Sequence, residues 1–137
     1  MKDCIFCKII NQELPCKKIY EDDLCLAFLD IAPNSDGHCL VIPKTHSEDL
    51  TSSSFEDLQA VAIAKVKVVE ILNAKLPQKP AGYNFISNQG AEAYQVVFHY
   101  HEHIVPKYVK DEGYTIKINK NPKDLTPDEL YEYFTSK

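Results

Sequence analysis

Three histidines, His99, His101 and His103, occupy alternate positions within one short and largely apolar stretch. Successive side chains of a β-strand point to opposite faces, so this spacing predicts a strand over residues 96–105 with three imidazoles on one face, about 6.6 Å apart. A single histidine on a half-buried strand is commonly a packing residue, whereas three in alternation indicate a chemical site. We therefore expect one face of this strand to serve a ligand or a metal.

Four further segments have the composition of short strands, and the turn residues between them predict antiparallel neighbours. They are residues 18–21, 25–29, 38–43 and 83–87. A helix is expected over residues 55–76, because Ser54 can cap its start and Pro77 follows its end. Its apolar positions predict one buried stripe, formed by residues 58, 61, 62, 66, 69, 72 and 76. A helical turn is expected at residues 5–11, and a capped helix from Thr126.

These elements add up to an α+β fold, an antiparallel five-stranded sheet with one long helix packed on it. A chain of 137 residues has the length of a single domain. We expect its core to span about residues 4–108, followed by a tail and helix over residues 109–137.

The formal net charge of −5 and the complete absence of arginine exclude a broad basic surface for nucleic acid. Any phosphate contact must then come from lysine, histidine, amide side chains or backbone N–H groups. The sequence shows neither a signal peptide nor a membrane span. The five cysteines lack the spacing of a secreted disulfide framework, which fits a reducing compartment. We therefore expect a cytoplasmic protein with neither a nucleic-acid nor a membrane partner.

Cys4 and Cys7 form a C-x-x-C pair, a spacing that suits two thiolate ligands of one metal ion. Zinc bound by two cysteines would complete its tetrahedron with two histidines, for which His46 and one of the three alternating histidines are candidates. Two small buried residues at a helix start would produce the same pair. A redox role would need a preceding strand, and none is expected before Cys4. A closed zinc site of this composition is structural.

Two chemistries remain open for the histidine strand. Three imidazoles can hold a catalytic zinc ion with an open coordination position. Alternatively, one imidazole acts as a nucleophile toward phosphorus while its neighbours manage charge and protons around the phosphoryl oxygens.

Residues 95–106, Gln-Val-Val-Phe-His-Tyr-His-Glu-His-Ile-Val-Pro, resemble the H-x-H-x-H-x-x signature of the histidine triad (HIT) superfamily. Four other segments resemble its bacterial Hint-like branch in order and spacing. They are residues 4–10, 28–31, 37–46 and 88–90. The resemblance implies a HIT-like fold, a purine nucleotide as small-molecule partner, and a homodimer with the long helix and the last sheet strand at its interface.

The resemblance also implies hydrolysis or transfer of nucleotidyl groups from purine nucleoside phosphoramidates or related nucleotides, through a covalent nucleotidyl-His101. A neutral imidazole is a competent nucleophile at cell pH. The implied catalytic set is His99, His101 and His103. The implied phosphate contacts are His38, Asn88, Gln95, His101 and His103. Asp30 is the implied ribose contact, and the implied apolar slot for the base consists of Phe6, Ile9, Phe28 and Ile31.

For the metal, the resemblance implies a structural zinc ion held by Cys4, Cys7, His46 and His99, which leaves His101 free to react with phosphorus. Two other functions stay as alternatives. One is a nucleotide-binding or scaffolding module in which hydrolysis is incidental, and the other is a metallohydrolase with zinc among the three alternating histidines.

Three residues depart from the family pattern. Tyr94 stands where relatives usually carry glycine and Val96 where many carry serine, so we expect an altered contact with the leaving group. Glu102 interrupts the apolar x positions of the signature. It is expected on the face opposite the histidines, in solvent or at an interface.

Overall fold

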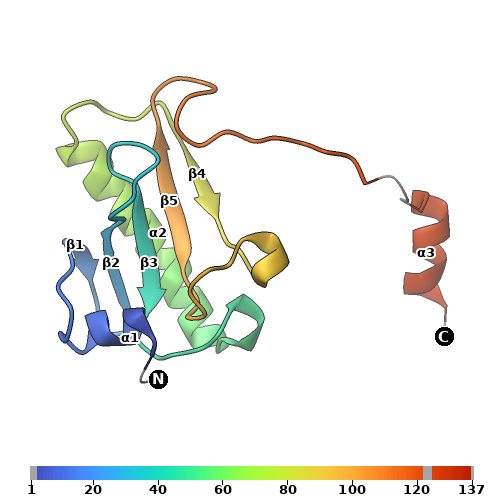
Figure 1. Cartoon of the computed structure of the whole chain (residues 1–137), viewed down its shortest axis with the longest axis horizontal. Coiled ribbons are helices and arrows are strands. Elements are labelled where there is room, and N and C mark those ends of the chain that lie inside the picture. The colour runs from blue at the N-terminus through green and yellow to red at the C-terminus, as the bar shows by residue number, and fades with distance from the viewer. Residues whose placement is uncertain (1–2, 122–124, 137) are drawn as a thin grey trace.

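The computed structural model describes residues 3–121 and 125–136, and it contains one five-stranded antiparallel sheet. The strands lie in the order β1-β2-β3-β5-β4 (Figure 1). Their bounds are Lys18–Glu21 for β1, Cys25–Leu29 for β2, Cys39–Pro43 for β3, Gly82–Ile86 for β4 and Glu102–Lys107 for β5. Helix α2 (Phe55–Lys75) covers one face of the sheet. The expected α+β architecture is confirmed.

The neighbouring inner strands β2 and β3 are buried almost throughout, because both faces of the sheet are covered there. Alternate side chains separate into two clusters, as the pleat of a strand requires. One cluster packs against α2 and contains Cys25, Ala27, Cys39, Val41 and Ile104. The other lies on the opposite face under the short helix α1 (Ile5–Ile10) and contains Phe6, Leu26, Phe28, Leu40 and Ile42.

Helix α2 begins where the sequence indicates, with the Ser54 hydroxyl accepting the Asp57 N–H at 3.1 Å. Its buried stripe differs from the predicted one. Val61, Ala64, Val68 and Leu72 are buried, whereas Ala62 and Val66 are exposed. Each residue turns the helix by about 100°, so the spacing 61-64-68-72 stays on the sheet side while Ala62 lies a quarter-turn away. The predicted stripe combined residues from two faces.

The last strand is shorter than predicted, since β5 begins at Glu102 and not at residue 96. Before it, the Tyr100 N–H donates to the carbonyl of Ser47 at 2.7 Å instead of joining the strand ladder. A short 3₁₀ turn, η2 (Ala91–Ala93), lies between β4 and this segment. Of the three alternating histidines, only His103 therefore lies on a strand, and the prediction that all three share a strand face is wrong.

After β5 the chain leaves the sheet. The Tyr108 hydroxyl donates to the carbonyl of Asp36 at 2.8 Å. Helix α3 (Pro127–Thr135) starts at the predicted capping box, where Thr126 Oγ1 accepts the Glu129 N–H at 3.2 Å. In Figure 1 this helix lies apart from the sheet and α2. Its apolar side chains are exposed and comprise Leu130, Tyr131, Tyr133 and Phe134. No helix in the described ranges has the length and apolar character that crossing a bilayer requires.

Candidate active site and metal site

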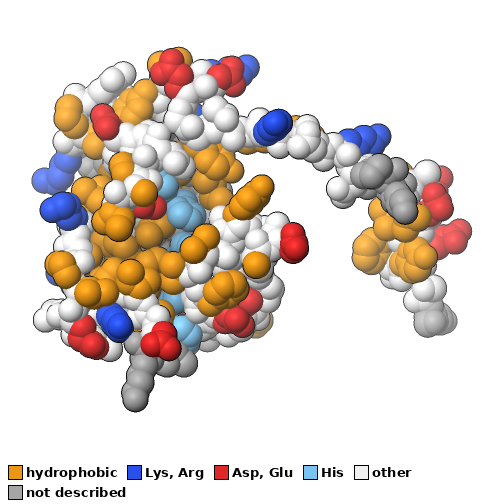
Figure 2. Space-filling view, in the orientation of Figure 1, with side chains coloured by type: hydrophobic (Ala, Val, Ile, Leu, Met, Phe, Trp, Pro, Cys, Tyr) orange, Lys and Arg blue, Asp and Glu red, His pale blue; other side chains and the backbone are white. Residues whose placement is uncertain are grey.

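A cavity of about 720 Å³ opens on the face of the sheet opposite α2. Figure 2 shows histidine side chains there, surrounded by apolar side chains. Most of the predicted nucleotide-binding residues line this main cavity. They are Phe6, Ile9, Phe28, Asp30, Ile31, Asn88, His101 and His103. Sequence reasoning missed ten other lining residues, among them Ile5, Cys16, Lys17, Asn34 and Tyr114.

His101 occupies the bend just before β5, and a hydrogen bond fixes its tautomer. Its Nδ1 lies 2.7 Å from the carbonyl oxygen of His99. A carbonyl oxygen only accepts, so Nδ1 carries the proton and Nε2 keeps its lone pair. The ring is held edge-on against Phe6, with centroids 5.1 Å apart. Burial lowers the pKa of His101 below that of an ordinary histidine, which favours the neutral ring.

His38 and His103 form a directed hydrogen-bond chain beside His101. The backbone N–H of Asn34 donates to His38 Nδ1 at 3.0 Å, so His38 carries its proton on Nε2. That Nε2–H faces His103 Nδ1 at 3.0 Å, which leaves the proton of His103 on Nε2. His103 lines the main cavity, whereas His38 lies behind it. The chain therefore supplies one oriented N–H donor to a ligand in the cavity.

Both rings of this chain are neutral at pH 7. Burial lowers the pKa of His38. Burial, and after it the neighbouring His101 and His38, lower the pKa of His103 to about 4. The Asp30 carboxylate lies 3.5 Å from His38 Nε2 and opposes these shifts only in part. A neutral imidazole can donate a proton from one nitrogen and accept at the other.

The remaining predicted contacts differ in how they are placed. One Asp30 oxygen accepts the Ala32 N–H at 2.8 Å and shapes the following turn. Ile31, at the cavity wall, is 98% exposed. Gln95 is buried and does not line the main cavity. Its amide group instead accepts the Gly90 N–H and donates to two backbone carbonyls, so it braces the loop before the histidines.

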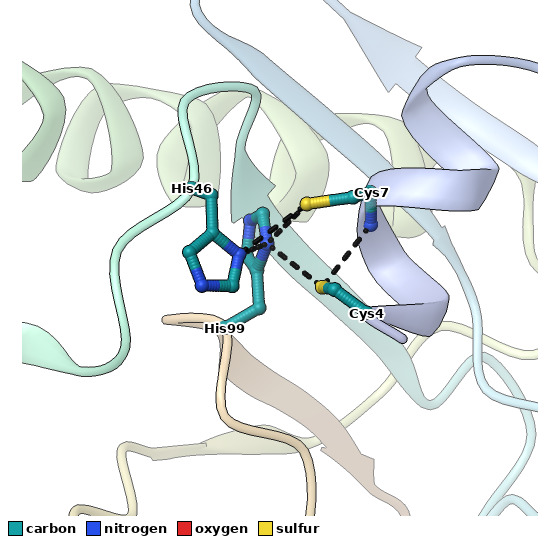
Figure 3. A group of neighbouring side chains, drawn as sticks. All are labelled: Cys4, Cys7, His46 and His99. Carbon is teal, nitrogen blue, oxygen red and sulfur yellow. Dashed lines mark hydrogen bonds between the residues drawn. The ribbon is translucent and has the colours of Figure 1, made fainter. Parts of the chain in front are cut away.

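The ligand atoms of four side chains lie close together beside the start of α1 (Figure 3). They belong to Cys4, Cys7, His46 and His99. The spacings are 3.4 Å from Cys4 Sγ to His99 Nδ1, 3.3 Å from Cys7 Sγ to His46 Nδ1 and 3.2 Å between the two Nδ1 atoms. Ligands of a tetrahedral zinc ion, bound at about 2.3 Å for sulfur and about 2.05 Å for nitrogen, lie roughly 3.3–3.6 Å apart. The donor set and its spacing therefore fit a metal ion.

The outer contacts of His99 support the same assignment. Its Nε2–H donates to the carbonyl of Pro43 at 2.8 Å, which leaves Nδ1 free for a metal. The Cys7 N–H donates to Cys4 Sγ at 3.3 Å, and such a bond would hold this sulfur in place beside a metal ion. Within the described ranges, the candidate metal clusters contain His99 and His103 separately and do not include His101. The geometry thus argues against one zinc ion shared by three alternating histidines.

The environment of Glu102 differs from the prediction, because its side chain is buried and not in solvent. Lys65 Nζ on α2 donates to one carboxylate oxygen at 2.5 Å, and the Tyr100 hydroxyl donates to the other. A carboxylate in an apolar stretch is seldom buried without a partner. That rule could have pointed to an α2 lysine facing this strand.

Comparison with known proteins shows which family the chain resembles. The sequence pattern that defines the HIT domain family matches residues 11–110. An adenosine 5′-monophosphoramidase of Schizosaccharomyces pombe is 39% identical over 127 residues, covering 93% of this chain and 90% of that protein. An adenylylsulfatase of Arabidopsis thaliana is 43% identical over 131 residues, covering 90% of this chain and 66% of that protein.

Solved structures agree with the sequence relatives. A HIT family member from Bacillus subtilis superimposes with a TM-score of 0.84 at 40% identity, covering 98% of this chain and 94% of that one. A Zn-bound histidine triad family protein from Mycobacterium smegmatis gives a TM-score of 0.76 at 35% identity, covering 89% and 85% of the two chains. Sequence pattern and fold agree with these proteins over most of the length, and the chain belongs to the HIT domain family.

Proposed function

We propose that this chain hydrolyses purine nucleoside phosphoramidates, or transfers their nucleotidyl group, through a covalent bond between phosphorus and His101 Nε2. The single observation that carries the proposal is the hydrogen bond from His101 Nδ1 to the His99 carbonyl, at 2.7 Å. It leaves the other ring nitrogen with a lone pair in the wall of the main cavity. Relatives named as a monophosphoramidase and an adenylylsulfatase support nucleotide hydrolysis.

The main cavity offers suitable contacts for the base, the ribose and the phosphate of a nucleotide. Phe6, Ile9 and Phe28 form an apolar wall for the base. The Asp30 oxygen that does not accept the Ala32 N–H can accept from the ribose hydroxyls. Asn88 and the His103 Nε2–H can donate to the phosphoryl oxygens, where charge must be stabilised in the transition state. His38 positions His103, and Gln95 positions the loop that precedes the histidines.

The reaction has two steps. In the first, the Nε2 lone pair of His101 forms a bond to phosphorus while the P–N bond of the phosphoramidate breaks. The amine leaves with the electron pair of that bond and takes one proton from solvent. In the second step, water adds to phosphorus, the bond to Nε2 breaks and its electron pair returns to the ring. The water loses one proton to solvent, so the net reaction consumes one water and releases a nucleoside monophosphate and an amine.

The cluster of Cys4, Cys7, His46 and His99 is proposed to hold structural zinc, because two thiolates and two imidazoles at tetrahedral spacing match its preference. When bound, zinc would join the start of α1 to the loop after β3 and to the segment before β5. The zinc-bound description of one solved relative supports this proposal. His101 then keeps both ring nitrogens outside the metal site.

A homodimer is proposed to form over α2 and the edge strand β4. The last strand of the sequence, which the resemblance implied for this interface, is β5, and it lies between β3 and β4. The outer side of α2 exposes Phe55, Ile63 and Val66, and Phe85 of β4 is half exposed. Exposed apolar side chains of this size favour burial against a second copy.

The proposed function is tested by trapping its intermediate. Adenosine 5′-phosphoramidate is mixed with the protein, the reaction is quenched with acid-free denaturant, and the peptide that contains His101 is weighed by mass spectrometry. An added adenylyl group on His101 is expected in the wild type and not in His101→Ala. Turnover without any adduct on a millisecond-to-second time course would contradict the covalent route.

A further inference from the structure

Three polar side chains form a hydrogen-bonded network on the α2 side of the sheet, and none of them takes part in the proposed reaction steps. Glu102 is 7% exposed, and the Lys65 ammonium donates to one of its carboxylate oxygens at 2.5 Å. Tyr100 is 3% exposed, and its hydroxyl donates to the other oxygen. In Figure 1, α2, which carries Lys65, runs behind the sheet. The network thus joins α2 to the segment that contains His101.

Stability alone does not account for this network. Tyr100 packs in the apolar cluster against α2, beside Val61 and Ile104. Taking a carboxylate such as that of Glu102 out of water costs free energy, and its ion pair recovers that cost only in part. Apolar side chains of similar size would fill the same space without the cost. Hydrogen bonds, in contrast to apolar contacts, are directional, so a polar network can hold one geometry.

The network spans the position of His101 in the chain. Tyr100 and Glu102 are the residues on either side of His101, and their side chains bond to each other. Both lie on the α2 side, whereas His101 lines the main cavity on the opposite face. Glu102 begins β5 and pairs with Val41 of β3, so the sheet fixes one end of this link. Lys65 fixes the same end to α2.

The peptide unit between His99 and Tyr100 connects the network to the imidazole. Its N–H donates to the Ser47 carbonyl at 2.7 Å, and its carbonyl oxygen accepts from His101 Nδ1 at 2.7 Å. The N–H and the C=O of a trans peptide unit point in opposite directions within one plane. A rotation of this plane therefore weakens both hydrogen bonds together. The direction of the His99 carbonyl depends on how Tyr100 is held.

We infer that Lys65, Glu102 and Tyr100 are positioning residues that aim the His99 carbonyl at His101 Nδ1 and so keep the lone pair on Nε2. The inference rests on the proposed function, because this lone pair matters for the reaction only if Nε2 attacks phosphorus. An imidazole without the carbonyl can also carry its proton on Nε2, and that tautomer has no lone pair at the reacting nitrogen. The three side chains are not among the residues that line the main cavity, so substrate binding is expected to stay unchanged.

The tautomer of His101 can be measured without substrate. Long-range proton–nitrogen correlation spectra of the full-length protein with isotope-labelled histidine distinguish a protonated from an unprotonated ring nitrogen, and His101→Ala identifies the signals of His101. The wild type is expected to carry the proton on Nδ1. Tyr100→Phe keeps the ring in the apolar cluster and removes only the hydroxyl. It is expected to show a mixture of both tautomers at His101.

Kinetics of the same variant separate positioning from binding. Tyr100→Phe is expected to lower kcat for adenosine 5′-phosphoramidate by about tenfold and to leave KM within about twofold of the wild type. The matched control is Tyr83→Phe, which removes another tyrosine hydroxyl that donates to α2, at 2.7 Å from Asn73 Oδ1. Tyr83 lies on β4, outside the wall of the main cavity. Its variant is expected to keep the wild-type kcat and the wild-type tautomer.

A triple variant separates positioning from stability. Lys65→Met/Tyr100→Phe/Glu102→Leu replaces the network with apolar side chains of similar size, so it is expected to unfold at a higher urea concentration than Glu102→Leu alone. Its kcat is nevertheless expected to stay about tenfold below that of the wild type, with both tautomers present at His101.

A triple variant with the wild-type kcat and a single Nδ1–H tautomer would overturn the inference. Tyr100→Phe with both properties unchanged would overturn it as well. In either case an adenylyl adduct on His101 would still support the proposed function. Conversely, tautomer changes as expected in the two variants, with no adduct on His101 of the wild type, would overturn the proposed function and still support the positioning of the ring.

Discussion

His99 and His101 are two residues apart, yet they use opposite ring nitrogens, and this difference divides the site into two regions. His99 donates from Nε2 to the Pro43 carbonyl and presents Nδ1 to the two cysteines and His46. His101 donates from Nδ1 to the His99 carbonyl and keeps Nε2 for the main cavity. Each role is set by a backbone carbonyl that holds one proton in place.

The two regions also differ in how their polar atoms are arranged. In the candidate metal site, four donor atoms all lie within 4.8 Å of one another. Around His103, the donors follow one another in a line, from Asn34 N–H to His38 and from His38 to His103. A convergent set holds a cation, and a linear set orients a proton. The arrangement therefore supports the proposal that identical side chains serve structure in one region and chemistry in the other.

The largest effect that separates the regions is expected from His101→Ala. Removing the nucleophile should lower kcat for adenosine 5′-phosphoramidate by a factor on the order of 10³ or more. Bound metal, measured by elemental analysis, should stay at the wild-type ratio because His101 is not a ligand. A His101→Ala variant that keeps a tenth of the wild-type rate would contradict the role of His101 as nucleophile. A variant that loses its metal would contradict the separation of His101 from the metal site.

His99→Ala, or a chelator, is expected to have the opposite effect: the protein loses stability while the reaction at His101 is retained. Loss of the metal should lower the free energy of unfolding by about 3–4 kcal/mol, the stabilisation given by a ligand at 100 to 1,000 times its Kd. Denaturant unfolding with and without added zinc measures this change. The metal-free protein should still form the His101 adduct at low temperature, at a reduced rate. Unchanged unfolding after complete metal removal would contradict a structural site.

Acid should destabilise the folded protein through protonation of His103, the last residue of the hydrogen-bond chain from Asn34 through His38. Its pKa is lowered to about 4 in the folded protein, chiefly by burial, and is about 6.5 when unfolded. The unfolded chain therefore binds more protons between pH 6.5 and pH 4, and stability falls as the pH falls through this window. The slope from His103 is about 1.4 kcal/mol per pH unit at most.

The control for this pH dependence is His103→Asn, whose amide oxygen can still accept from His38. Urea unfolding of both proteins between pH 4.5 and pH 7 gives the difference that belongs to His103, since acid effects on the metal ligands are common to both. Parallel curves for the two proteins would show that His103 does not resist protonation.

Much of this arrangement could be predicted from the sequence because it depends on local rules. The strands at residues 18–21 and 25–29, the Ser54 cap and the Thr126 capping box are confirmed with their predicted bounds. The C-x-x-C pair and His46 are brought together with one of the three alternating histidines, as the number of zinc ligands required, and that histidine is His99, the one that the family resemblance implied.

What could not be predicted depends on contacts between distant segments. The strand over residues 96–105 starts late because the Tyr100 N–H pairs with Ser47, a residue from the loop after β3. The buried stripe of α2 is chosen by the sheet that it covers and not by the apolar pattern alone. Gln95 braces a loop, and Glu102 is buried, because each meets a partner far away in sequence.

Glu102 gives the smallest predicted effect, and it tests which contacts of this buried carboxylate stabilise the fold. Glu102→Leu leaves the Lys65 ammonium and the Tyr100 hydroxyl without their shared acceptor and should cost about 2 kcal/mol of unfolding free energy. Lys65→Met/Glu102→Leu removes the stranded charge and should recover at least half of that loss, measured by urea unfolding. A double variant as unstable as Glu102→Leu would mean that the carboxylate stabilises the Tyr100–His103 backbone itself and not the ion pair with α2.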